Sequence, residues 1–149
     1  MQDRDLFKGR RVDNEEWIIG NLVFSEDSED GWETIIIPTV ESNMFIKGES
    51  RGDLGFENWY KVDKDTICRC TGSKDKNGKL VWENDIMEAH LDDMFPEDVT
   101  RTKVIWDKNG WVTIESGSVD RYYLDDFDTE YYEIIGNIFD NPELLESEE

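Results

Sequence analysis

The amino-acid sequence predicts an all-β protein with little helix, built as a small barrel or sandwich of many short antiparallel strands. Isoleucine and valine together number 22 of the 149 residues, whereas leucine and alanine together number only 9. β-Branched side chains lose rotamer freedom in a helix and pack well on a pleated sheet. Glycine, asparagine and aspartate interrupt the apolar runs at short intervals, as they do where tight turns join strands.

The first half of the chain contains apolar runs separated by polar or glycine-rich segments. Ser25–Gly31 is expected to be an acidic loop, and Glu41–Glu57 a long loop or a strand with an excursion. Gly20 is a candidate bulge, and Pro38 indicates a strand end or an edge position. The expected strands are Trp17–Phe24, Trp32–Val40, Trp59–Val62 and Thr66–Thr71.

The segment Thr71–Met87 contains the strongest local signal. Asn77-Gly78 predicts a two-residue type I′ turn, because this dipeptide tolerates positive φ at both central positions. Leu80–Trp82 leaves the turn as a strand. Two short strands cannot bury enough apolar surface alone, so the hairpin is expected to pack on a larger sheet.

The second half of the chain repeats the turn sequence Asp-Lys-Asn-Gly at residues 107–110. Lys103–Trp106 and Trp111–Ile114 flank it, so a second hairpin is expected. Tyr122–Phe127 is compatible with one helical turn, Tyr131–Phe139 with a strand, and Asn141–Leu145 with a short terminal turn.

The net charge is −21, and it is concentrated in the second half. Residues 85–149 contain 4 basic and 19 acidic side chains, a net charge of −15. Such a surface repels nucleic-acid phosphates, so direct nucleic-acid binding is not expected. Two interpretations stay open: a solvated surface that maintains solubility, or an acidic mimic of nucleic acid that occupies a basic protein groove.

Motifs for catalysis, metals and cofactors are lacking in the sequence. Cys68 and Cys70 lack the spacer and the second ligand pair of a zinc site, and His90 is the only histidine. The sequence contains neither a Walker pattern nor a dinucleotide fingerprint. No catalytic residue, metal or cofactor is therefore expected. An enzyme based on paired carboxylates stays as a third hypothesis.

Aromatic residues are the remaining candidates for a site. Trp82, Trp106, Trp111, Tyr122 and Tyr123 form a possible interaction surface, because aromatic side chains are enriched at binding hot spots. The same residues are equally suited to filling a small β core.

Several runs together resemble the YopX family of small phage and prophage proteins: Thr66–Ile86, Val104–Asp107 and Glu133–Leu145, with Phe7–Arg11 and Trp17–Leu22 at the start. The resemblance covers nearly the whole chain. It implies a β-rich fold over residues 1–149 as a single YopX-like unit, whose C-terminal half is similar to a small SH3-like barrel. A subdivision into residues 1–65 and 66–149 stays open.

The resemblance implies no reaction and no catalytic residues. The expected function is that of a non-enzymatic phage or prophage accessory protein that acts through protein–protein contacts, with a homo-oligomer as one form of such contact. The protein partner stays unidentified. The chain opens with charged residues and lacks a long apolar run, so we expect no membrane association and a cytoplasmic location in a bacterial host cell.

Overall fold

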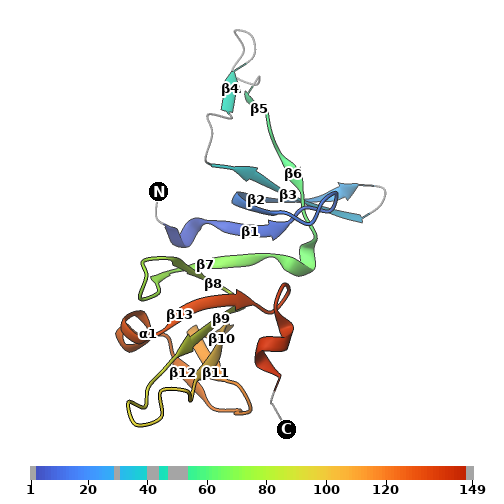
Figure 1. The fold of residues 1–149 in the computed structure, drawn as a ribbon. Helices are drawn as coiled ribbons and strands as arrows, with labels where there is room; N and C mark the ends of the chain where they lie inside the picture. Colours follow the sequence, from blue (N-terminus) through green and yellow to red (C-terminus); the bar gives the residue numbers. More distant parts are fainter. Residues whose placement is uncertain (1–2, 29–30, 40–43, 47–53, 147–149) are drawn as a thin grey trace. The chain divides into compact units, whose positions relative to one another are not determined.

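A computed structural model of the protein describes residues 3–28, 31–39, 44–46 and 54–146 (Figure 1). The chain divides into two compact units, Met1–Arg69 and Cys70–Glu149. All strand pairings in both units are antiparallel. The all-β prediction is confirmed. The subdivision into residues 1–65 and 66–149, which the sequence left open, stays a prediction.

The first unit is built around a sheet in which β1 pairs with β2 and with the first residues of β7, while β2 also pairs with β3, and β3 with β6. β4 and β5 form a separate two-stranded ribbon. The elements are the 3₁₀ helix η1 (Asp3–Asp5), β1 (Phe7–Arg10), β2 (Trp17–Ser28), β3 (Gly31–Pro38), β4 (Met44–Ile46), β5 (Leu54–Phe56), β6 (Tyr60–Lys61), the 3₁₀ helix η2 (Lys64–Thr66) and β7 (Cys68–Lys74).

The β2–β3 hairpin is longer than the sequence indicates. Backbone pairs continue through Ser25 and Glu33 to Ser28 and Gly31, so the acidic loop expected over Ser25–Gly31 is wrong for Ser25–Ser28 and for Gly31. The rest of that expected loop lies outside the described residues. Ladder hydrogen bonds use only the backbone, and they tolerate polar side chains. The β2–β3 register shifts between Ser25 and Ser28, and not at Gly20, where a bulge was expected. A Cβ atom at Gly20 would lie 2.0 Å from the carbonyl oxygen of Ile37, so glycine is required there by close backbone approach.

The second unit is built around an open five-stranded sheet with the strand order β12-β11-β10-β9-β13. In the described part of the chain no backbone pairing joins β12 to β13, so the barrel form of the prediction is wrong and an all-β sandwich fits. The elements after β7 are β8 (Leu80–Trp82), β9 (Asp85–Ala89), β10 (Thr100–Asp107), β11 (Gly110–Glu115), β12 (Arg121–Tyr123), α1 (Asp126–Tyr131), β13 (Glu133–Asn137) and the 3₁₀ helix η3 (Pro142–Leu145).

The core of the second unit joins the β7–β8 hairpin to this sheet. Val81 of β8 packs in one buried cluster with Met87 and Ala89 of β9, Val104 of β10 and Tyr132. The hairpin therefore covers a larger sheet, as a two-stranded element must in order to be stable.

The hairpin turn after β7 differs from the predicted type I′ turn. Lys74 pairs with Leu80, and only Gly78 has positive φ (+82°), while Asn77 does not. Gly78 donates its N–H to Asp75 O, and Asp75 donates its N–H to Lys79 O. This pattern is a turn followed by a glycine bulge, which needs positive φ at one residue only.

The helical turn expected over Tyr122–Phe127 begins later in the structure. Tyr122 and Tyr123 belong to β12, and α1 starts at Asp126 because Asp125 and Asp128 cap its first turn reciprocally. The predicted final turn at Asn141–Leu145 is present as η3.

Candidate functional site

The aromatic residues singled out in the sequence lie at different depths in the second unit. Trp82 is 6% exposed and belongs to the core. Trp106 and Trp111 face each other across β10 and β11, with ring centroids 5.2 Å apart and planes at 76°. Tyr122 and Tyr123 lie on β12 and are 62% and 68% exposed. Of the five candidates, Tyr122 and Tyr123 line the pocket described next. The interface role of all five stays a prediction.

A pocket of about 380 Å³ lies over one face of the five-stranded sheet. Thr100 and Thr102 are alternate residues of β10, so their side chains share a face. Glu115 pairs with Thr102, and Thr113 pairs with Tyr122, which extends this face across β11 to β12. The volume is at the lower end of the range for small-ligand sites.

Helix α1 provides the other wall of this pocket. Asp125 accepts hydrogen bonds from the backbone amides of Phe127 (3.0 Å) and Asp128 (3.4 Å), while Asp128 accepts one from the Asp125 amide at 3.0 Å. This capping box fixes the start of the helix. It holds the side chains of Asp125, Phe127 and Asp128 at the pocket.

The pocket is electronegative. Glu115, Asp125 and Asp128 are the acidic residues in its lining, and no lysine, arginine or histidine lines it. Burial raises the pKa of Asp128. Burial also raises the pKa of the Tyr132 phenol, and the negative charges of Asp128 and Glu115 add to that shift. Asp128 and Glu115 are therefore close enough to Tyr132 for their negative charges to raise the pKa of its phenol.

Thr102 lines this pocket and carries a buried hydroxyl group. The residue is 4% exposed. Among the described residues, its Oγ1 atom is a buried polar atom without a hydrogen-bond partner. Because the atom itself is covered, a molecule in the pocket does not reach it in this conformation.

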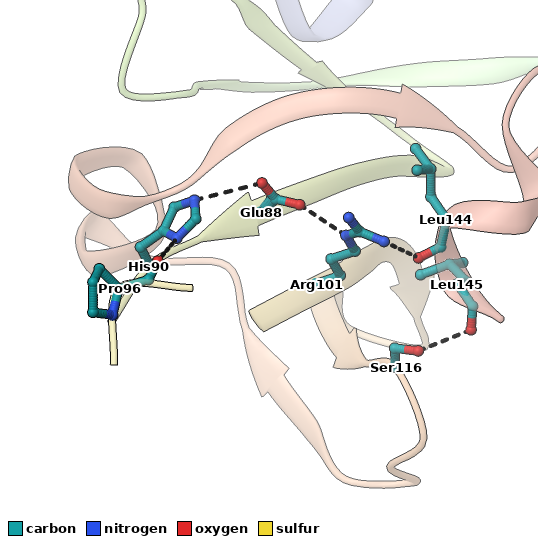
Figure 2. Close-up of polar contacts among 7 residues, drawn as sticks. All are labelled: Glu88, His90, Pro96, Arg101, Ser116, Leu144 and Leu145. Carbon is teal, nitrogen blue, oxygen red and sulfur yellow. Dashed lines mark hydrogen bonds and ion pairs between the residues drawn. The ribbon is translucent and has the colours of Figure 1, made fainter. Parts of the chain in front are cut away.

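A second polar arrangement lies around Glu88 and anchors η3 (Figure 2). Arg101 Nε donates to Glu88 Oε2 at 2.8 Å, and Arg101 Nη1 donates to the Leu144 carbonyl at 3.3 Å. His90 Nε2 lies 3.7 Å from Glu88 Oε1, and its Nδ1 lies 2.8 Å from the Pro96 carbonyl.

Ser116 belongs to the same arrangement and takes a structural part in it. Its hydroxyl donates to the carbonyl of Leu145 at 2.8 Å, while its backbone N–H donates to Arg101 O. The serine is thus tied to η3, and neither of these two contacts is with the histidine that a nucleophilic pair would need. The hydrogen bonds from Arg101 and Ser116 therefore hold η3 against the five-stranded sheet.

The first unit has a groove of different character, of about 330 Å³. Ile35 and Ile37 of β3 line it together with Glu33, Phe56 and Trp59. Phe56 is 39% and Trp59 is 56% exposed. Val23 lies opposite Ile35 in the β2–β3 ladder and is 41% exposed, which extends the apolar surface.

Sequence reasoning did not anticipate either cavity. The signal for the first was the capping spacing from Asp125 to Asp128. Thr100 and Thr102 gave none, because residues 100–103 are polar at every position and show no alternation. The groove of the first unit had no comparable signal, because Phe56 lies within the segment interpreted as a long loop or a strand with an excursion, and Trp59 comes just after it.

These features define a class: a small all-β protein of two antiparallel units that carries an apolar groove in one and an acidic, aromatic pocket in the other. The chain belongs to the YopX family, described as YopX protein, which matches residues 12–146. The resemblance seen in the sequence motifs is thereby confirmed.

A solved structure supports the fold. The crystal structure of protein EF1440 from Enterococcus faecalis is similar to this chain with a TM-score of 0.58 and 24% identity, over 94% of this chain and 96% of that one. At this identity the likeness concerns the fold alone. A comparison with curated proteins returns no match.

Within residues 3–28, 31–39, 44–46 and 54–146 no helix has the length and apolar character needed to cross a membrane. The same ranges contain no group of three or more histidine, cysteine, aspartate or glutamate side chains placed to hold a metal ion. Cys68 and Cys70 are buried thiols.

Proposed function

We propose that this protein is a non-enzymatic phage or prophage accessory protein that acts through protein–protein contacts. The observation that carries the proposal is the apolar groove of the first unit, where Ile35, Ile37, Phe56 and Trp59 meet. A contiguous apolar patch exposed to water is unfavourable unless a partner covers it, and such patches mark interaction sites in soluble proteins.

The groove is well suited to a protein contact. Its base comes from the β3 strand of a paired sheet, so the isoleucine side chains are held by the β2–β3 ladder. Trp59 is large, and it is exposed at the rim. Tryptophan is enriched among the residues that contribute most to binding at interfaces.

The test compares two matched variants with the wild-type protein. Trp59→Glu places a charge in the groove, and Met94→Glu places the same charge on a side chain that is 83% exposed and does not line the groove. Affinity-tagged versions of the three proteins are incubated with bacterial host lysate, and bound proteins are quantified by mass spectrometry. We expect one partner to be retained by the wild-type protein and by Met94→Glu, and lost by Trp59→Glu.

The proposal is overturned if no captured protein distinguishes the two variants and light scattering also gives the same monomeric mass for all three. A self-association lost only in Trp59→Glu would identify a second copy of the chain as the partner. Circular dichroism checks that both variants fold.

A second candidate function is an acidic mimic that inhibits a host DNA- or RNA-binding protein. The observation that favours it is the net charge of −15 on residues 85–149. Its partner would be captured at low ionic strength, displaced as salt rises, and insensitive to Trp59→Glu, because charge attraction between exposed groups is screened by salt. Capture of no nucleic-acid-binding protein at low salt would eliminate it.

A further inference from the structure

We propose that the pocket of the second unit binds an organic cation, namely the guanidinium or ammonium group of an arginine or lysine side chain. The inference rests on the proposed function in one respect, since the side chain is taken to come from a protein partner. The cavity and its chemistry can be tested without that partner.

The charges of the lining select a cation. Glu115, Asp125 and Asp128 contribute acidic groups, and no basic side chain in the lining balances them. The neighbouring Arg121 is directed to Asp107, with Nη1 2.8 Å from Oδ2, and it does not line the pocket. A phosphate or carboxylate ligand would be repelled by the same carboxylates.

The aromatic lining selects an organic cation rather than a metal ion. Tyr122, Tyr123, Phe127 and Tyr132 all line the pocket, and aromatic rings attract guanidinium and ammonium groups through their quadrupole. In the described ranges the carboxylates form no cluster with metal-binding geometry. A cavity of about 380 Å³ also accommodates a whole side chain, whereas a metal ion needs a tight cage.

The cation also fits the electrostatics of the buried groups. Burial raises the pKa of Asp128, which means that the ionised carboxylate is less favourable in the folded protein than in water. A bound cation would offset that desolvation and lower the pKa again. The ionised form of Asp128 therefore favours a positive group at the pocket.

The test uses the full chain and small probes of defined charge. Nα-acetyl-arginine methylamide presents a guanidinium group with no backbone charge, and the corresponding citrulline derivative has nearly the same shape but is neutral. Binding is followed by ¹H–¹⁵N NMR titration at physiological ionic strength. We expect saturable shifts centred on residues 102, 113, 122 and 128 with the arginine probe, and none with citrulline.

Variants then assign the interaction to the pocket. Glu115→Gln removes an exposed carboxylate from the lining and is expected to weaken binding about two- to fivefold. Tyr122→Ala removes an exposed ring and is expected to weaken binding by a similar factor of about two to five.

Glu97→Gln is the matched control, because it removes an exposed charge that does not line the pocket. If the arginine probe does not saturate, or if Glu97→Gln weakens it as much as Glu115→Gln does, the attraction is non-specific and the inference is overturned.

Free arginine distinguishes the source of the cation. It carries an additional amino group and carboxylate, and a pocket for a protein side chain should bind the blocked probe at least as tightly. Tighter binding of free arginine would overturn the assignment to a protein side chain. Failure of every cationic probe, together with a partner lost only in Trp59→Glu, would leave the proposed function standing and refute this inference alone.

Discussion

Asp75 shows at the scale of a single residue how a turn is fastened to the sheet. It is 5% exposed, and its Oδ1 atom accepts the amides of Asn77 and Lys79, both at 2.9 Å. Its Oδ2 atom accepts the amide of Ile134 at 2.9 Å. A buried carboxylate is stable only when hydrogen bonds replace its hydration, and here three backbone amides do so.

Asp75→Asn should therefore destabilise the protein. An amide group can accept through one oxygen only, so either the turn amides or the Ile134 amide would face an N–H donor. We expect the free energy of unfolding to fall by about 1–3 kcal/mol. Urea denaturation followed by tryptophan fluorescence measures it. Asp65→Asn, on an exposed residue, is the control, and an equal effect in both would contradict the explanation.

Asp128 gives a pH-dependent prediction at the same scale. Burial raises its folded-state pKa above the ordinary value of 3.8, so the folded state holds its proton more tightly than the unfolded state does. The stabilisation that protonation brings is fully present below the ordinary pKa and is lost as pH rises through the raised pKa. Ionised Asp128 therefore lowers the free energy of unfolding at neutral pH.

Asp128→Asn abolishes this titration. We expect the stability of the variant relative to the wild-type protein to improve as pH rises from about 3 to about 7. Chemical denaturation across that range measures the difference. Asp126→Asn removes a charge from an exposed side chain of the same helical turn and reports the general effect of a lower net charge. A pH-independent difference would show that burial does not shift the pKa of Asp128.

At the scale of elements, the two Asp-Lys-Asn-Gly turns show that one tetrapeptide adopts two conformations. At residues 75–78 the glycine has positive φ and the turn ends in a bulge. At residues 107–110 Asp107 pairs with Gly110, and Lys108 has positive φ (+46°) instead. The strand register decides which residue must take the left-handed conformation.

Gly78→Ala tests the first turn. Nothing lies within 4 Å of a Cβ atom built on Gly78, so the substitution changes only the backbone energy at φ +82°. We expect a loss of about 1–2 kcal/mol in the free energy of unfolding. Gly117 is a matched site, since its φ is +81° and its surroundings are equally open.

Thermal and urea denaturation of both alanine variants measure the loss. Similar effects at the two sites support a backbone origin. No effect at Gly78 would show that the turn changes type when alanine is introduced.

At the scale of the whole molecule, the net charge of −21 opposes folding through self-repulsion. Exposed charges are screened over a Debye length of about 10 Å at 0.1 M salt and about 30 Å at 0.01 M. We expect the melting temperature to rise when sodium chloride is added from low to moderate concentration. Calorimetry measures it, and a melting temperature that falls with salt would indicate that attractive ion pairs dominate.

Much of the fold was predictable because its signals are local. The second hairpin depends on turn chemistry and alternating apolar residues over a few positions, and its strands pair as expected from Trp106 and Trp111. The end of β3 at Pro38 follows from the missing amide hydrogen of proline. The extent of β2 escaped prediction because polar residues can continue a ladder when only backbone groups pair.

The candidate site was less predictable, because its members are brought together by pairing between distant segments. Tyr122, Tyr123 and Tyr132 stood out as aromatic residues of interest, whereas Thr102, Glu115 and Asp128 did not. Each of these residues is ordinary in its own segment. Strand register places Thr102 opposite Glu115, and the capping box directs Asp128 to the same cavity.

The sequence by itself therefore determined the all-β class, both hairpins and the family, since these depend on side-chain preferences and motifs within short segments. The tertiary structure alone decided that the C-terminal sheet is open, that Trp82 is buried, and that acidic and aromatic side chains from β10, β11, β12 and α1 share one pocket. The physical reason is that register and packing are settled by contacts between segments far apart in the chain, about which local preferences carry no information.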